Sequence, residues 1–144
     1  MKVLFLFGPN LGALGTRDPD RYGTQTLVEI MVEVAARATR LGHEIAWRQS
    51  ELEADLVAWT GGAADEGFSA IAINAGALSH YSEPLHDAIA ATPVPTIEVH
   101  QTNIYAREAF RRHSTIAPAC RVTIAGAGVG GYHLALEALP WITD

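Results

Sequence analysis

Short, continuous apolar stretches alternate along this chain with longer stretches in which apolar residues recur every three or four positions. The first apolar stretch, KVLFLF at residues 2–7, ends at Gly-Pro-Asn, a pattern typical of a strand buried on both faces of a parallel sheet. Residues 24–42 instead have helical spacing, with Thr24 or Thr26 as the N-cap and Gly42 as the stop. We therefore predict a strand and a helix, joined by an irregular loop over residues 8–23.

The same alternation continues to the end of the chain. Further strands are predicted over residues 43–50, 68–74, 94–99 and 120–126, and further helices over residues 52–63, 82–92, 104–111 and 130–142. Strands that alternate with helices form parallel βαβ units, with helices on both faces of the sheet. The predicted fold class is α/β, a flavodoxin-like three-layer sandwich with a five-stranded parallel sheet in the order 2-1-3-4-5, formed by one domain over residues 1–144.

Composition narrows the range of partners. The formal net charge is −6, whereas a protein that binds nucleic acid through its phosphates needs a surplus of Lys and Arg. No apolar run is long enough to span a membrane, and the first residues lack the apolar region and cleavage site of a signal peptide. We therefore expect a cytoplasmic protein that binds neither nucleic acid nor membrane.

Polar residues follow several of the predicted strands. Ligands of open parallel sheets bind outside the carboxyl ends of the strands. The polar residues at those ends are Asn10 after the first strand, Asn74 and His80 after the third, and Glu98, His100 and Thr102 after the fourth. We expect these side chains to converge on one site.

Glu98 and His100 are two residues apart at the end of a predicted strand, so their side chains point to the same face. A carboxylate that accepts a hydrogen bond from an imidazole fixes its tautomer and raises its basicity, which suits an acid/base pair near neutral pH. A half-buried histidine with a purely structural role would give the same Glu-x-His spacing, so that alternative stays open. No pair of histidines has the spacing typical of metal ligands, so no metal is predicted.

The loop GPNLGALGTRDPDRYG, residues 8–23, contains Arg17 and Tyr22 in a glycine-rich segment that can close over the strand ends as a lid. A free tyrosine, with a reference pKa of about 10, is a poor base at neutral pH, but a neighbouring guanidinium stabilises the phenolate. The segment is therefore either a lid that supplies a base on closing or an ordinary surface loop.

Two further motifs leave alternatives open. GAGVGG, residues 126–131, matches a dinucleotide-binding pattern but lacks the later strand with an acidic residue, and a tight turn between strand and helix explains it equally. AREAFRRHS, residues 106–114, contains Arg107, Arg111, Arg112 and His113. We expect at least two of these four on a solvated helix face and one arginine on a ligand oxygen.

Several segments together resemble one family along nearly the whole chain. They are LFGPNLGALGTRDPDRYG, WRQSELEADLVAW, INAGALSH, IEVHQTNIYAREAFRRHS and GYHLALEAL. In this order and spacing they resemble the type II 3-dehydroquinases (3-dehydroquinate dehydratases). The resemblance implies a hydro-lyase without cofactor or metal, which converts 3-dehydroquinate to 3-dehydroshikimate by anti elimination through an enolate. It also implies a homododecamer of trimers, in which a neighbouring subunit contributes to each site.

The resemblance also implies a role for each candidate residue. Tyr22 would remove the C2 proton with help from Arg17, and Asn10 would hold a water that stabilises the enolate oxygen. His100, oriented by Glu98, would protonate the departing C1 hydroxyl. The substrate would be bound by Asn74, His80, Asp87, Thr102 and Arg111.

Three departures from the family pattern leave room for other functions. Thr102 stands where serine is typical, Tyr81 where threonine is typical and His86 where arginine is typical. A non-catalytic relative that binds a dehydroquinate-like acid is therefore an alternative, and a flavin or nucleotide module is a third. The enzyme would serve the shikimate pathway of aromatic amino acid biosynthesis or quinate metabolism, since both use the same step.

Overall fold

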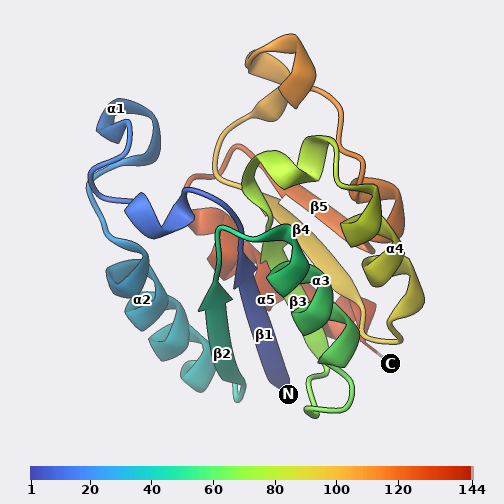
Figure 1. The fold of residues 1–144 in the computed structure, drawn as a ribbon. Coiled ribbons are helices and arrows are strands. Elements are labelled where there is room, and N and C mark those ends of the chain that lie inside the picture. The colour runs from blue at the N-terminus through green and yellow to red at the C-terminus, as the bar shows by residue number, and fades with distance from the viewer. Residues whose placement is uncertain (144) are drawn as a thin grey trace.

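The computed structural model describes residues 1–143, which form a central parallel sheet between two layers of helices (Figure 1). The strands are β1 (Lys2–Phe7), β2 (Glu44–Gln49), β3 (Ala70–Asn74), β4 (Thr96–His100) and β5 (Val122–Ala125). They pair in the order β2-β1-β3-β4-β5, and every pair is parallel. The predicted fold class and strand order are confirmed.

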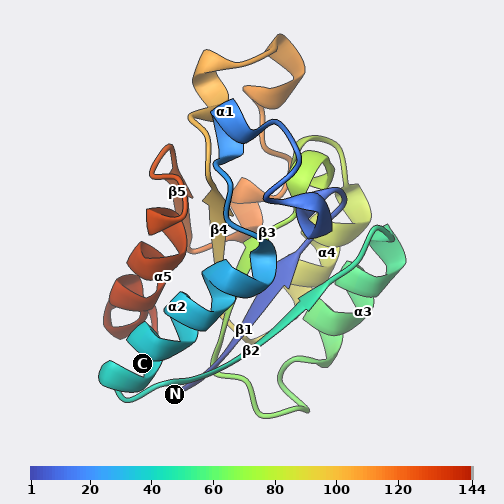
Figure 2. The ribbon, with the colours of Figure 1, turned by 90° about the vertical axis from the view of Figure 1, so that its left-hand side faces the viewer.

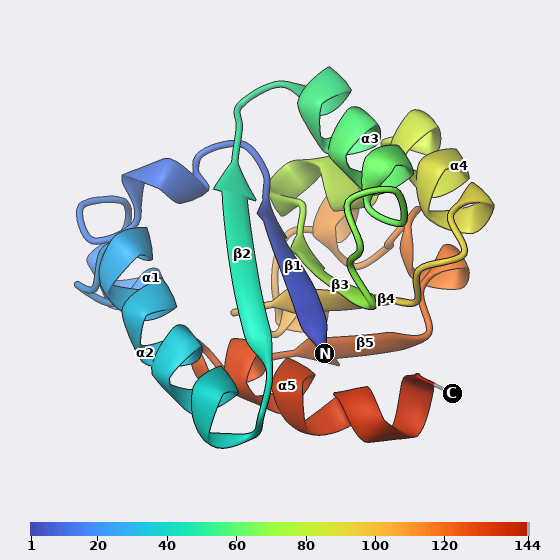
Figure 3. The ribbon, with the colours of Figure 1, turned by 90° about the horizontal axis from the view of Figure 1, so that it is seen from below.

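Two pairs of helices cover the two faces of the sheet. The four long helices are α2 (Leu27–Arg40), α3 (Glu53–Gly62), α4 (Glu83–Ala91) and α5 (Gly130–Ile142). Figure 3 shows α2 and α5 on one face and α3 and α4 on the other. Strand β1 supplies both cores, because Val3, Phe5 and Phe7 pack on the α2 and α5 side while Leu4 and Leu6 pack on the other.

The ends of α2 follow from local chemistry. The Thr26 hydroxyl accepts a hydrogen bond from the Glu29 backbone N–H, and the Glu29 carboxylate accepts one from the Thr26 N–H, which completes a capping box. After the helix, Gly42 has a φ of 79°, a conformation that glycine adopts without a Cβ penalty. Thr26, rather than Thr24, is therefore the N-cap.

Two segments differ from the predictions. The opening loop is not wholly irregular, because it contains a 3₁₀ turn, η1 (Leu11–Ala13), and one turn of helix, α1 (Pro19–Tyr22). The helix predicted over residues 104–111 is wrong. Two 3₁₀ turns, η3 (Ile104–Ala106) and η4 (Ala109–Arg111), replace it, because Arg107 and Glu108 between them are extended, with ψ of −164° and 149°.

These two segments rise above the carboxyl ends of the strands (Figures 1 and 2), and a hydrogen bond from Arg107 to Tyr22 joins them. The remaining short turns are η2 (Gly76–His80) after β3 and η5 (Ala117–Ala119) before β5. Residues 126–129 connect β5 to α5, and Gly126 and Gly128 have positive φ there, as expected of a tight turn. Among residues 1–143, no helix is long and apolar enough to cross a membrane.

The start of the opening segment lies very close to the loop after β3. The Gly8 N–H donates to the Asn74 carbonyl at 2.8 Å, and a Cβ on Gly8 would lie 2.3 Å from the Ala75 carbonyl oxygen. Only glycine fits at this position. The absence of a side chain at Gly8 therefore allows the loops after β1 and β3 to enter the site together.

Candidate active site

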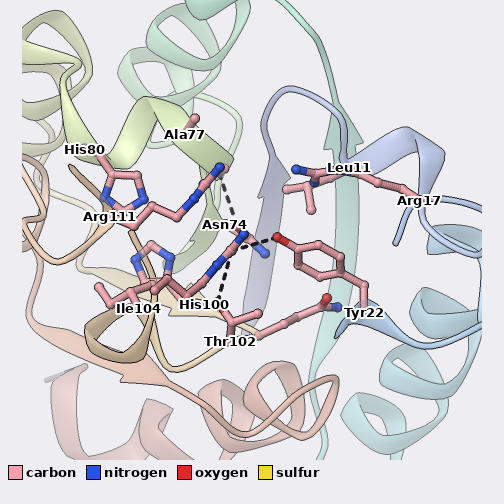
Figure 4. Close-up of a pocket in the computed structure, with 13 residues that line it drawn as sticks. Leu11, Arg17, Tyr22, Asn74, Ala77, His80, His100, Thr102, Ile104 and Arg111 are labelled. Atoms are coloured by element: carbon pink, nitrogen blue, oxygen red, sulfur yellow. Dashed lines mark hydrogen bonds between the residues drawn. The ribbon is translucent and has the colours of Figure 1, made fainter. Parts of the chain in front are cut away.

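A pocket lies at the carboxyl end of the sheet, between the opening segment and the loops that follow β3 and β4 (Figure 4). Its lining residues are Leu11, Arg17, Tyr22, Asn74, Gly76, Ala77, His80, His100, Gln101, Thr102, Ile104, Arg107 and Arg111. Seven of them were predicted as site residues from the sequence. Of the six strand-end residues expected to converge, four lie together in this lining: Asn74, His80, His100 and Thr102.

Glu98 and His100 form a buried pair at the end of β4. His100 Nε2 lies 2.6 Å from Glu98 Oε1, as expected for side chains on the same face of a strand. The Glu98 side chain is fully buried, and the His100 side chain is 6% exposed. Because the carboxylate accepts from Nε2, the Nδ1 atom of His100 is free to exchange a proton with a ligand.

Glu98 stays ionised despite its burial. Burial by itself would raise the pKa of this carboxyl. The hydrogen bond and positive charge of His100, together with hydrogen bonds from Ser114 and Thr123, outweigh it and hold the pKa of Glu98 below its ordinary value. An anionic carboxylate therefore faces His100 Nε2 and fixes the orientation of the imidazole ring.

His80 lies beside this pair. Its ring stacks on the His100 ring with centroids 5.9 Å apart, and its Nδ1 donates to the His113 carbonyl at 2.7 Å. Burial lowers the pKa of His80, and the positive charge that His100 and Arg111 carry when protonated acts in the same direction. Because Nδ1 is bound to a carbonyl, neutral His80 presents Nε2 as an acceptor.

Two arginines from different segments flank Tyr22. The Arg17 guanidinium lies 4.9 Å from the centroid of the Tyr22 ring, and Arg107 Nη1 donates to the Tyr22 hydroxyl at 2.8 Å. The same Arg107 atom donates to the Thr102 hydroxyl at 3.3 Å. Figure 4 shows the Tyr22 hydroxyl pointing into the pocket, toward the side where His80 and His100 lie.

Sequence reasoning missed Arg107 as a site residue. We expected one arginine of residues 106–114 to bind a ligand oxygen, and Arg111 was the predicted site residue. In the structure, the side chains of Arg107 and Arg111 both line the pocket. Arg112 and His113 are exposed, so the expectation that at least two of the four face solvent is correct. The extended backbone at residues 107 and 108 directs Arg107 toward Tyr22, and no pattern in the sequence indicated that conformation.

Asn74 is fixed from two sides at the end of β3. Its amide nitrogen donates to the Tyr132 hydroxyl at 2.9 Å, and its amide oxygen accepts from the Gly76 N–H at 3.2 Å. Burial raises the pKa of Tyr132 far above its ordinary value, so this phenol is neutral in the folded protein. Tyr132 therefore orients Asn74 and carries no charge of its own.

Besides Glu98, which is fully buried and contacts His100, two predicted residues lie outside the pocket lining. Asn10 is exposed, with a φ of 69°, and its backbone N–H donates to Glu51 Oε2 at 2.8 Å. Asp87 projects from α4 with 82% of its side chain exposed, and it lines a separate hollow together with His113. Within one chain, these two side chains do not join the other site residues.

The described side chains do not form a metal site. Within residues 1–143, no three His, Cys, Asp or Glu side chains are grouped so that they could hold a metal ion. The pocket instead combines a phenol, two imidazoles and three guanidinium groups. Such a set can transfer protons and bind an anionic, hydroxylated ligand with its own side chains.

Comparisons with known proteins agree with this geometry. The sequence pattern of the family Dehydroquinase class II matches residues 1–140. The 3-dehydroquinate dehydratase of Thermus thermophilus is 51% identical over 137 residues, which cover 95% of this chain and 92% of that protein. The 3-dehydroquinate dehydratase 2 of Ralstonia nicotianae is 50% identical over 141 residues, which cover 95% and 92%.

Solved structures give the same result. The crystal structure of a type II dehydroquinase from Propionibacterium acnes matches with a TM-score of 0.92 and 41% identity, over 96% of this chain and 94% of that one. The type II dehydroquinase of Butyrivibrio crossotus matches with a TM-score of 0.94 and 34% identity, over 97% of each chain. On sequence, fold and pocket together, the chain belongs to the class II dehydroquinase family.

Proposed function

We propose that this chain is a 3-dehydroquinate dehydratase, a hydro-lyase that eliminates water from 3-dehydroquinate to give 3-dehydroshikimate. A base removes the C2 proton, and the electron pair moves onto the C3 carbonyl oxygen to form an enolate. The enolate then collapses to a C1–C2 double bond, and the C1 hydroxyl leaves with a proton from a general acid. One observation carries the proposal: Tyr22 and His100 line the same pocket, and the buried Glu98 carboxylate contacts His100.

Tyr22 is the proposed base. A phenol serves as a base at neutral pH only when its anion is stabilised. Arg107 donates directly to the Tyr22 oxygen, and the Arg17 guanidinium lies over the ring. Both guanidinium groups therefore lie where they offset negative charge on the Tyr22 oxygen while it accepts the C2 proton.

His100 is the proposed acid, and Glu98 orients it. The contact between His100 Nε2 and the buried carboxylate leaves Nδ1 for the leaving hydroxyl. Glu98, held anionic, fixes the tautomer and the ring orientation with which His100 donates the proton. Tyr22 and His100 reach the pocket from different segments, and in the proposed anti elimination they act on opposite faces of the substrate ring.

The remaining lining residues provide the groups that a polyhydroxylated acid needs. Asn74 and His80 can bind ring hydroxyls, and Arg111 and Thr102 can bind oxygens of the substrate, including its carboxylate. We assign no metal or cofactor to the reaction. For Asn10, support for binding a water near the enolate comes from the family resemblance alone, because its side chain is exposed.

We further infer that the chain self-associates, as a homododecamer of trimers. The support is the family resemblance together with Asp87, an expected substrate-binding residue that lies outside the pocket of its own chain. In a trimer, Asp87 would serve the pocket of a neighbouring subunit. A cytoplasmic location, and a role in the shikimate pathway or in quinate metabolism, belong to the same proposal.

The test is a direct assay. Purified protein is mixed with 3-dehydroquinate, and the rise in ultraviolet absorbance of the conjugated enone product is followed. Tyr22→Phe and His100→Ala should each reduce kcat by orders of magnitude while circular dichroism and the melting temperature stay close to wild type. Binding of 3-dehydroquinate by the wild-type protein without any rise in absorbance would instead support a non-catalytic relative.

A further inference from the structure

We propose that Ser114 is a positioning residue for the general acid. Its hydroxyl holds the Glu98 carboxylate in the orientation and the ionised form that His100 needs, and Thr123 acts as a second, weaker donor. The effect on catalysis rests on the proposed function, whereas the effect on the geometry of Glu98 does not. Neither residue lines the pocket, and neither was predicted as a site residue from the sequence.

The hydrogen bonds around Ser114 assign the direction of its hydroxyl proton. Ser114 Oγ lies 2.6 Å from Glu98 Oε1, and it accepts a hydrogen bond from the Ala117 N–H at 3.1 Å. The other acceptor within reach, the Ser79 carbonyl, is 3.5 Å away, which is long for a hydroxyl donor. The proton therefore points to the carboxylate.

Glu98 receives donors from three separate parts of the chain. His100 and Ser114 both contact Oε1, and Thr123 from β5 donates to Oε2 at 3.2 Å. A fully buried carboxylate is costly unless several donors replace its lost water. With each oxygen bound, the carboxylate cannot rotate away from His100 without breaking at least one of these bonds.

Ser114 is itself held rigidly. On one side the His113 carbonyl accepts from His80 Nδ1 at 2.7 Å, and on the other the Thr115 N–H donates to the Ser79 carbonyl at 2.7 Å. The Thr115 hydroxyl also donates to the His80 carbonyl at 3.0 Å. Residues 113–115 thus fix both histidines of the pocket, His80 through the backbone and His100 through Glu98.

Removal of a donor changes how Glu98 titrates. The titratable groups around this carboxylate are His100, His80 and the Cys120 thiol, and burial raises the pKa of Cys120 to about 12, so that it stays neutral. These three groups include no arginine or lysine, so none of them supplies a permanent positive charge that would keep Glu98 ionised if a hydroxyl donor were lost. Without Ser114 Oγ, Glu98 should therefore become protonated at a higher pH, and His100 should lose its anionic partner there.

The test compares Ser114→Ala with Ser114→Thr, which keeps the hydroxyl. We expect Ser114→Ala to lower kcat about tenfold, the low end of the effect of losing one hydrogen bond to a charged group, with KM within a factor of about two. The acid-side fall of kcat should move to higher pH. Ser114→Thr should restore most of kcat and the wild-type pH profile.

Thr123→Val provides an independent variant, because Thr123 is exposed on an edge strand and its replacement has the same shape. It should cause a smaller change in the same direction. Thr96→Val, a buried threonine of β4 at the far end of the strand, is the control and should keep the wild-type pH profile. The proposal is overturned if Ser114→Ala and Thr123→Val both keep the wild-type kcat and pH profile, or if Ser114→Thr is as impaired as Ser114→Ala.

A crystal structure of Ser114→Ala separates this proposal from the proposed function. We expect the Glu98 carboxylate to rotate and the contact of 2.6 Å with His100 Nε2 to lengthen or break. If the wild-type protein does not dehydrate 3-dehydroquinate, the proposed function fails. The crystal structure of Ser114→Ala would still decide whether Ser114 positions Glu98. An unchanged carboxylate and imidazole would then contradict the positioning role.

Discussion

Arg107 should contribute more to turnover than to folding, and Arg107→Met tests this. Its side chain is only 12% exposed, and its Nη1 atom lies 2.8 Å from the Tyr22 hydroxyl. When the phenol is ionised, this contact becomes a hydrogen bond between two charged groups. Such bonds contribute about 1.5–3 kcal/mol. Because methionine matches much of the aliphatic length of arginine, the main loss should be this bond.

The expected loss of rate follows from that energy. At about 1.4 kcal/mol for each tenfold change in rate, kcat should fall about 10- to 150-fold. Arg107→Lys keeps the charge but not the planar group that contacts Tyr22 and Thr102 together, so its loss should be smaller. The measurement is the initial rate of enone formation at saturating 3-dehydroquinate, from pH 6 to about pH 10.

The pH dependence separates this explanation from a general structural defect. At high pH, hydroxide ionises the phenol without the guanidinium, so the gap between Arg107→Met and wild type should narrow. Arg40→Met, at an exposed position of α2, is the matched control and should retain wild-type turnover. The reasoning is refuted if Arg107→Met keeps the wild-type kcat, or if its deficit is the same at every pH.

Three further predictions concern residues around the site. Gly8→Ala should lower the free energy of unfolding by about 1–3 kcal/mol in urea titrations, because its Cβ would lie 2.3 Å from the Ala75 carbonyl oxygen. Gly61→Ala is the control, because a Cβ there meets open space and should leave stability unchanged or raise it. Equal changes in the two variants would contradict this reasoning. Burial lowers the pKa of His80 in the folded protein, so the folded state binds fewer protons than the unfolded chain and stability falls as the pH drops below about 6.5. The melting temperature of His80→Gln should therefore fall less than that of the wild type between pH 8 and pH 5.5. Parallel plots of melting temperature against pH for the two proteins would exclude the effect. Cys120, with its pKa raised to about 12, should react with iodoacetamide at pH 8 far more slowly in the native protein than in urea, and similar rates would contradict its burial.

Local patterns in the sequence were sufficient for most of the fold. A continuous apolar run such as KVLFLF is compatible with burial on both faces, and β1 indeed contributes side chains to both cores. The two-residue spacing of Glu98 and His100 placed them on one face of a strand, and they are in contact. These inferences succeed because strand and helix periodicity are set by backbone geometry, which is the same in every protein.

The tertiary structure decided which polar side chains meet. Arg107 and Arg111 reach the pocket while Arg112 does not, because the segment forms two 3₁₀ turns around an extended pair of residues instead of one helix. Ser114, sixteen residues from Glu98 along the chain, contacts it only because the turn at residues 113–115 is tied to the loop after β3. Asp87, which only the family resemblance indicated, lies within α4 and lines a hollow separate from the pocket of its own chain. Contacts of this kind depend on how distant segments pack and on the directions of irregular backbone, and neither leaves a periodic signal in the sequence.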